Sequence, residues 1–369
     1  IDNYELYEVS MNTELADLTV NGSTVTGFDP AIMSYDVVLP DYDVPVVDGT
    51  PAAAFATIVV NDAEKVPGTT TIDVIAEDGT TTGTYTINFT GTPATMMHSY
   101  TFEDGTANDV VGTAHGTVVA GTIANGAYTA ATVGDIIELP AADIAINTYT
   151  AVTLEGYILA DVDNTGATMM AYFGGNENNV GGNGYFFTPD RWTESRTGIS
   201  CGNITEPWTV EEGVSGAPVS VGDKHHLVSV LTAANIKWYI DGVLVGTSPL
   251  TGDNAIGNLS NANAWLCKGG YTNDPTWLGT IHEFNIYQGE LDSTTVADRA
   301  SAFLNSSDAT LSELIVDVGT LTPAFAPATT HYAIAVPEGT TTVNIAAAAT
   351  ITGATVTGTG AVDISGGSL

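Results

Sequence analysis

Residues 236–245 read Ile-Lys-Trp-Tyr-Ile-Asp-Gly-Val-Leu-Val. The pair Asp241-Gly242 stands between two apolar runs. Such a pair is the strongest short-range sign of a β-hairpin, because both residues tolerate the positive φ angles of a tight turn. Comparable apolar runs, bounded by Gly, Asn, Asp and Pro, recur at short spacing, for example at 35–39 and 85–89. This spacing predicts an all-β protein built from sandwiches. Helical periodicity favours a helix only at 293–304.

The composition limits the classes of function. The 369 residues are enough for two or three domains, each with its own core. The 43 acidic and 7 basic residues give a formal net charge of -36, which repels phosphate backbones and excludes nucleic acid as a partner. No apolar stretch approaches the ~20 residues that span a bilayer, so we expect no direct membrane insertion in these residues. Thr, Gly, Val and Ala dominate, which is typical of secreted or cell-surface extracellular proteins.

The two ends of the chain share an internal repeat. The matching segments are 18–22 with 314–316, 27–30 with 323–327, and 34–40 with 331–337. The first copy continues into a run of alternating apolar residues at 72–89. This pattern resembles the cadherin-like β-sandwich, a bacterial Ig-like domain of exported surface proteins. The resemblance implies one such module at 12–94 and a second module, incomplete at its C-terminus, at 308–369.

The incomplete second copy leaves two interpretations of the chain ends open. It stops before any segment that would match the run at 72–89, and residues 3–9 read like the last strand of a preceding module. We expect a piece of a longer array, in which residues 1–11 belong to the module before. The alternative is donor-strand assembly, in which residues 1–11 complete the open module of a neighbouring copy of the chain.

Residues 96–304 form a unit of a different kind. Four of its segments resemble the laminin-G family of the concanavalin A-like superfamily; they are 100–109, 150–158, 225–246 and 277–287. Because these segments frame the whole unit, the resemblance is to a complete domain. It implies a jelly roll of two packed antiparallel sheets, placed between the two cadherin-like modules.

The same resemblance implies a structural calcium ion between the opening loop and the last strand. Ca²⁺ takes about six to eight oxygen ligands, which carboxylates and backbone carbonyls supply. Members of the family usually carry an acidic residue directly after Gly-x-Ile, but His282 stands there and Glu283 follows it. The alternative is a solvated acidic turn. The expected calcium ligands are Glu103, Asp104, Asp109 and Glu283.

Aromatic and amide side chains gather between residues 172 and 208, and again near 271–277. Sugar binding needs this combination, because the C–H face of a pyranose packs on a ring while its hydroxyls seek polar partners. The alternative for each ring is a place in the core. The candidate ligand-binding residues are Asn176, Tyr185, Arg191, Trp192, Trp208, Tyr271, Asn273 and Trp277.

No catalytic arrangement is recognisable in the sequence. The closely spaced carboxylates that related jelly-roll glycosidases place on one strand are missing, and so are a Gly-x-Ser-x-Gly elbow, a zinc pattern and a phosphate loop. His225 and His226 are adjacent, but successive side chains of a strand face opposite sides, so one ion does not readily bind both. We therefore expect a structural role for this pair and no enzyme activity in these residues.

The chain has two cysteines, Cys201 and Cys267, and both lie in the central unit. In an oxidising compartment a disulfide between them would close a long loop and stabilise the fold by about 4 kcal/mol. We expect this disulfide, with two buried free thiols as the alternative.

These observations favour a non-catalytic extracellular protein of binding or adhesion. The laminin-G-like unit would bind a glycan or a cell-surface partner, and the sandwich modules would act as spacers. Two alternatives stay open. One is a structural subunit of a surface filament, which implies contacts between neighbouring copies, and the other is an accessory region of a polysaccharide-degrading enzyme.

Overall fold

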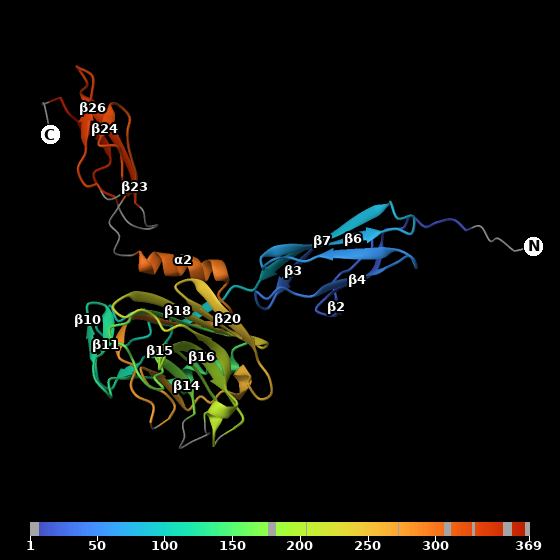
Figure 1. Ribbon diagram of the computed structural model, residues 1–369, viewed down its shortest axis with the longest axis horizontal. Helices are drawn as coiled ribbons and strands as arrows, with labels where there is room; N and C mark the ends of the chain where they lie inside the picture. Colours follow the sequence, from blue (N-terminus) through green and yellow to red (C-terminus); the bar gives the residue numbers. More distant parts are fainter. Residues whose placement is uncertain are drawn as a thin grey trace, which may run out of the picture.

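Three β-rich units follow one another along the chain (Figure 1). The computed structural model describes residues 7–175, 182–203, 205–271, 273–305, 311–326, 329–349 and 356–365. Among these residues, no strand of one unit pairs with a strand of another. The prediction of an all-β protein is confirmed, since strands dominate every unit. No helix in the described ranges is long and apolar enough to cross a membrane.

The first unit is a sandwich of two sheets around one core. Its strands are β1 (Leu15–Val20), β2 (Ser23–Thr24), β3 (Ser34–Leu39), β4 (Val47–Pro51), β5 (Thr57–Asn61), β6 (Gly68–Ile75) and β7 (Thr82–Gly91). One sheet has the order β2-β1-β4 and the other the order β3-β7-β6-β5, with β3 and β7 parallel. Apolar residues alternate along β6 and β7, so Ile72, Val74, Tyr85 and Phe89 all face the core.

The second unit contains an eight-stranded antiparallel sheet. Its strands are β8 (Thr95–Tyr100), β10 (Thr122–Ala124), β11 (Ala127–Ala130), β13 (Val152–Leu159), β18 (Lys224–Leu231), β19 (Asn235–Ile240), β20 (Val243–Pro249) and β22 (Gly279–Gln288). The order is β10-β11-β22-β13-β18-β19-β20, and β8 also pairs with β22. The predicted hairpin is confirmed: Ile240 pairs with Val243, and Asp241 and Gly242 take φ angles of 52° and 81°.

A seven-stranded sheet packs against the first face to face. Its strands are β9 (Thr117–Val118), β12 (Ile137–Leu139), β14 (Ala171–Gly174), β15 (Gly184–Arg191), β16 (Glu194–Ser200), β17 (Glu212–Gly216) and β21 (Asn263–Leu266), in the order β17-β16-β15-β14-β21-β12-β9. Large rings fill the space between the sheets; the ring centres of Phe187 and Trp238, for example, lie 5.4 Å apart. Four short helices lie in the connections; they are α1 (Ala141–Ile144), η1 (Ile146–Thr148), η2 (Pro207–Thr209) and η3 (Ile256–Asn258).

One longer helix, α2 (Ser293–Leu304), lies across the outer face of the eight-stranded sheet (Figure 1). Asp292 caps it by accepting hydrogen bonds from the backbone N–H groups of Thr294 and Thr295. Val296 is fully buried against Val228 and neighbouring residues of the sheet. The helix predicted at 293–304 is therefore confirmed.

A buried lysine joins the first unit to the second. Lys237 Nζ in β19 lies 2.6 Å from Asp43 Oδ1 of the first unit and 2.6 Å from Glu290 Oε1 of the second. Asn235 also donates to Asp43 Oδ2, at 2.6 Å, and the Tyr42 N–H donates to Glu290. Because the ammonium group is shared between carboxylates of both units, it holds the two units together.

The third unit has two small antiparallel sheets. Its strands are β23 (Leu311–Val316), β24 (Thr320–Thr322), β25 (Ala333–Ala335), β26 (Thr342–Ala349) and β27 (Gly360–Asp363). They pair in the orders β23-β26-β27 and β24-β25. Val343 is the one apolar residue that is buried among the described part of this unit.

Candidate functional site

Two of the predicted ligand-binding rings belong to the core of the second unit. Tyr185 and Trp277 are both 0% exposed. The Tyr185 hydroxyl donates to Ser229 Oγ at 2.6 Å, and the Trp277 indole N–H donates to Asp190 Oδ1 at 2.7 Å. The prediction that they contact a ligand is wrong, because strand alternation turns Tyr185 inward and a buried carboxylate satisfies Trp277.

The predicted pair Trp192 and Trp208 is exposed but divided. Trp192 is 58% exposed and Trp208 is 59% exposed. Trp192 stands in the turn between β15 and β16, and Trp208 follows the far end of β16. Seven residues of β16 separate these ends, which corresponds to about 23 Å of strand. Neighbours in sequence are therefore not neighbours in space, and the two tryptophans do not form one site.

Arg191 supports Trp192 and offers no free charge to a ligand. Its guanidinium lies 5.2 Å from the centre of the Trp192 ring and 5.4 Å from that of Phe186. Arg191 Nε also donates to Glu194 Oε1 at 3.1 Å, and the side chain is buried. Arg191 therefore holds the hairpin turn in place.

Trp208 meets Tyr271 edge to face, with ring centres 5.9 Å apart and planes at 78°. We call this pair the Trp208–Tyr271 platform. Its support is close: a Cβ atom added at Gly182 would approach Pro207 Cβ to 2.6 Å and the Tyr271 hydroxyl to 3.3 Å. Polar groups surround the platform, since the Asn203 amide donates to Thr209 in the same loop. The platform thus presents the exposed ring of Trp208, which Tyr271 supports, beside hydrogen-bonding side chains.

The platform stands at the end of a row of aromatic side chains on the outer face of the seven-stranded sheet. Phe186, Tyr172 and Trp265 are paired neighbours on β15, β14 and β21. The row is covered, since its rings are nearly inaccessible and Lys268 Nζ lies 3.9 Å from the centre of the Trp265 ring. It therefore serves as a second small core beneath the platform.

The two remaining predicted ligand residues give less information. Asn273 is exposed two positions after Tyr271. Asn176 lies outside the described residues. Both stay predictions.

The four expected calcium ligands do not form one cluster: Glu103 and Glu283 line one cavity, whereas Asp104 and Asp109 bond elsewhere. Both carboxylate oxygens of Asp109 are occupied: Oδ2 lies 2.7 Å from His98 Nδ1, and Oδ1 accepts from the backbone N–H of Gly112 at 2.9 Å. Burial alone would raise the pKa of Asp109, but the hydrogen bonds from His98 and the backbone hold it at about 2. Asp104 turns back to Thr106 in its own loop.

The predicted calcium ligand set is therefore wrong. Nowhere in the described ranges do three or more His, Cys, Asp or Glu side chains gather as a metal site would require. The acidic loop near 104–109 instead satisfies its carboxylates locally, which the spacing of the residues did not reveal.

The disulfide prediction is also wrong, because Cys201 and Cys267 are separate buried thiols. Cys201 follows β16 and Cys267 follows β21, and two strands lie between these in the sheet. Three strand spacings amount to about 14 Å, whereas a disulfide needs Cα atoms roughly 4.4–6.8 Å apart. Burial raises the pKa of the Cys201 thiol to about 11, so this thiol is unreactive in the folded protein.

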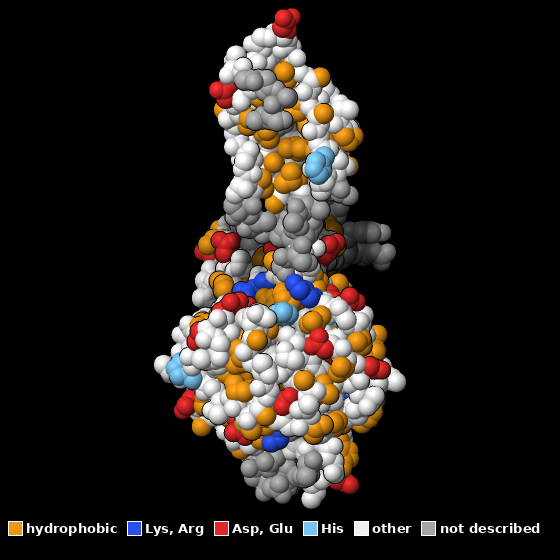
Figure 2. All heavy atoms as spheres, turned by 90° about the vertical axis from the view of Figure 1, so that its left-hand side faces the viewer, with side chains coloured by type: hydrophobic (Ala, Val, Ile, Leu, Met, Phe, Trp, Pro, Cys, Tyr) orange, Lys and Arg blue, Asp and Glu red, His pale blue; other side chains and the backbone are white. Residues whose placement is uncertain are grey.

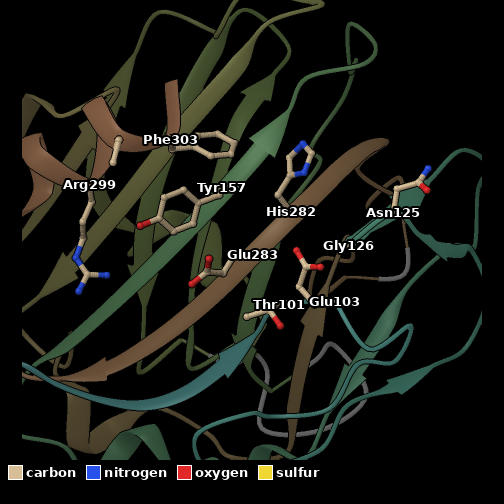
Figure 3. A pocket seen from close by; sticks show the side chains of 10 residues that line it. Thr101, Glu103, Asn125, Gly126, Tyr157, His282, Glu283, Arg299 and Phe303 are labelled. Carbon is tan, nitrogen blue, oxygen red and sulfur yellow. The ribbon is translucent and has the colours of Figure 1, made fainter. Parts of the chain in front are cut away.

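A cavity of about 470 Å³ lies beneath α2, and no pattern in the sequence predicts it. We call it the α2 cavity. Figure 3 shows the side chains of Tyr157 and Phe303 on one side of it and Asn125 on the other. Its walls come from the loop after β8, the β10–β11 turn, β13, β22 and α2. The lining residues are Thr101, Glu103, Asn125, Gly126, Tyr157, His282, Glu283, Arg299, Ala302 and Phe303.

A β-bulge supplies two of these lining residues. Opposite β13, Tyr157 pairs with Glu283 and Ile158 with Ile281, so His282 is an extra residue in β22. Ile281 on one side of it faces the core, and His282 and Glu283 both face the cavity. The extra residue at His282 is thus a β-bulge that re-aims a side chain, as bulges near functional sites often do.

A buried carboxylate, Glu155, joins α2 to the sheet next to the cavity. Its Oε2 accepts from the Tyr287 hydroxyl at 2.7 Å and from Arg299 of α2 at 3.2 Å. Its Oε1 lies 2.9 Å from His226 Nε2 and accepts from the Tyr157 hydroxyl at 3.0 Å. Burial alone would raise the pKa of Glu155, but the bonds and charges of His226 and Arg299 hold it well below its usual range.

The adjacent histidines face opposite sides, as strand alternation predicts. His226 meets Glu155, whereas His225 Nδ1 lies 2.9 Å from Asp241 Oδ2 in the β19–β20 turn. Each has its own carboxylate partner, so the predicted structural role of the pair is confirmed.

The central unit is similar to proteins that are known by sequence. Residues 129–297 match the Laminin_G_3 family, described as the Concanavalin A-like lectin/glucanases superfamily. A gellan lyase from Bacillus sp. is 38% identical over 102 residues, which are 27% of this chain and 4% of that protein. The chain thus spans a small part of the length of this relative.

Solved structures with a similar course of the chain include domain 4 of AbnA, a GH43 extracellular arabinanase from Geobacillus stearothermophilus, in complex with arabinotriose. It is 20% identical with a TM-score of 0.44, over 57% of this chain and 100% of that chain. The Trypanosoma rangeli sialidase is 15% identical with a TM-score of 0.42, over 57% of this chain and 33% of that chain. By its family match and its two packed sheets, the central unit at 129–297 is a laminin-G-like domain with the concanavalin A-like lectin fold.

Proposed function

We propose that the laminin-G-like domain is a non-catalytic glycan-binding module of a secreted or cell-surface protein. The observation that carries the proposal is the Trp208–Tyr271 platform, in which Trp208 is 59% exposed yet held in place by Tyr271 and the chain around Pro207. A ring that is exposed yet fixed offers a ligand a flat apolar face whose position is already set. The lectin family of this domain supports the same conclusion.

The chemistry of the platform fits a sugar. The C–H face of a pyranose ring packs on an aromatic face, and its hydroxyls bond amides and carboxylates nearby. Asn183 and Asn203 supply such groups in the loops beside Trp208, and Asp274 accepts from the Tyr271 backbone N–H at 3.2 Å. Because the ring is fixed before the sugar arrives, less conformational entropy is lost on binding.

The absence of catalysis is supported by the state of the buried carboxylates. Glu155 accepts from side chains of three strands and one helix, and Asp109 is saturated by His98 and the backbone. Asp190 accepts from Trp277 and from Asn164. A nucleophile or general acid must reach its substrate, whereas these groups are turned toward the protein.

The similarity to gellan lyase supports one specific setting for this module. Over 102 residues, 38% identity connects a stretch of this chain with a small part of that protein. We therefore place the domain in the accessory region of a larger protein that acts on polysaccharide. There it would hold the polymer, and the sandwich units would set its distance from the rest of the protein.

Glycan-array binding followed by titration calorimetry tests the proposal. Trp208→Ala should weaken binding of the selected glycan by about tenfold or more, the scale of one buried aromatic contact. The matched control is Trp192→Ala, because Trp192 is equally exposed but lies at the other end of β16. Equal loss in both variants, or no loss in Trp208→Ala, would show that the platform is not the binding site.

A further inference from the structure

The α2 cavity presents polar groups that the described part of the chain does not satisfy. The Glu103 carboxylate takes part in no hydrogen bond or ion pair within that part, and Glu283 accepts only from Asn285, at 2.7 Å. His282 Nε2 is buried without a partner there. Since a buried polar atom without a partner is costly, His282 Nε2 indicates a ligand that completes it, and the exposed Glu103 carboxylate can reach the same ligand.

Aromatic rings form the apolar wall of the same cavity. Tyr157 and Phe303 meet edge to face with ring centres 5.0 Å apart, and His282 approaches Phe303 to 5.6 Å. Figure 3 shows the carboxylates of Glu103 and Glu283 across from these rings. The cavity therefore combines rings on one side with hydrogen-bond acceptors on the other.

Side chains of both charges lie in or beside the cavity. Arg299 is paired with Glu155, and Lys224 Nζ lies 5.1 Å from the centre of the Phe303 ring, while the lining carboxylates Glu103 and Glu283 form no ion pair with a described residue. Figure 2 shows Lys and Arg side chains beside apolar side chains just below the third unit, and a further basic side chain lower on the same face. These mixed charges disfavour a strongly charged ligand. The lining carboxylates instead favour a ligand that carries hydrogen-bond donors.

We propose that the α2 cavity is a second saccharide site, which takes a neutral mono- or disaccharide unit. The hydroxyls of the sugar would donate to Glu103 and Glu283 and bond His282, while the sugar ring packs on Phe303. A volume of about 470 Å³ suits a ligand of that size. Burial raises the pKa of Glu283, and the Glu155 charge adds to the rise. A hydroxyl that donates to Glu283 would therefore also stabilise its charged form.

This site is separate from the Trp208–Tyr271 platform. The cavity lies on the outer face of the eight-stranded sheet under α2, whereas the platform lies beyond the seven-stranded sheet. Either site can bind without the other, so the inference does not depend on the proposed function of the platform.

Saturation-transfer NMR and calorimetry on the full chain test the proposal, with glucose, galactose, cellobiose and lactose as neutral probes. Glucosamine and glucuronic acid serve as charged probes. At least one neutral probe should bind, and Glu103→Gln should weaken it by about tenfold, the scale of a hydrogen bond to a charged group. Because Glu103 bonds no described residue, this variant should fold normally. Trp192→Ala, which changes an exposed tryptophan outside both proposed sites, is the matched control and should bind the same probe unchanged.

A second variant displaces the same carboxylate without removing it. Gly126→Ala would place a Cβ atom 2.6 Å from Glu103 Oε1 at a φ of +68°, so it should displace the carboxylate and weaken the same probe. Three results would overturn the proposal: no neutral probe binds at about 10 mM, which corresponds to very weak affinity; a charged probe is preferred; or the cavity variants bind like the original protein.

Discussion

Glu155→Ala gives a sharp test of how α2 is held on the sheet. The substitution removes the acceptor of five side-chain donors: His226, Tyr157, Tyr287, Asn285 and Arg299. Breaking one buried charge pair costs about 3–5 kcal/mol, and each buried donor left without a partner costs about 1–3 kcal/mol before the structure relaxes. Allowing for relaxation, we expect the free energy of unfolding of the domain to fall by about 4 kcal/mol.

Urea unfolding followed by tryptophan fluorescence measures this loss directly. All five tryptophans of the chain lie between residues 192 and 277, so their emission reports only the laminin-G-like domain. Glu155→Gln keeps the shape and one acceptor oxygen and should cost about half as much. The matched control is Glu138→Ala, a strand carboxylate that is exposed on the other sheet and should change stability by less than about 0.5 kcal/mol. A loss under about 1 kcal/mol for Glu155→Ala would refute the assigned role of the network.

Three further outcomes follow from the same structure. Glu283 has a raised pKa through burial, so it contributes stability that is present below its unfolded pKa of about 4.3 and lost as pH rises through its folded pKa. Glu283→Gln should therefore be more stable than the original chain at pH 7 and flatten the stability profile from pH 4 upward; an unchanged profile contradicts this. Cys201 and Cys267 should be alkylated only on unfolding, and dithiothreitol should leave the melting temperature unchanged; mass spectrometry showing a linked pair would disprove the free thiols. Lys237→Met should leave Glu290 buried without its cation, cost about 3 kcal/mol and loosen the joint between the first two units, which small-angle scattering would show as a wider range of shapes.

The local patterns of the chain are enough to predict its strands and its longer helix. The hairpin at 236–245 forms as expected because Asp241 and Gly242 both accept positive φ, a condition set by two adjacent residues. The helix at 293–304 is likewise set by its own periodicity and by Asp292. These features depend on neighbours in sequence, and such neighbours are visible without a structure.

The sites depend on distant neighbours, and here prediction from the sequence fails. Trp208 and Tyr271 come together across 63 positions, whereas Trp192 and Trp208, which are close in sequence, lie apart along β16. The bulge at His282 is a matter of register between β13 and β22, so it is invisible until both strands are paired. Its one sign in the sequence is the histidine that stands where the family usually has an acidic residue.

The arrangement of the units gives the two faces of the laminin-G-like domain different roles. The first unit attaches through Lys237 of β19 and Glu290, and α2, which leads toward the third unit, covers the outer face of the eight-stranded sheet. Figure 1 shows β14, β15 and β16 on the side of the domain away from α2. Both neighbouring units therefore connect on one side, and the Trp208–Tyr271 platform is left on the other. If the sandwich units act as spacers, a ligand as large as a polysaccharide can reach the platform without meeting them, whereas the α2 cavity beside the joints suits only a small one.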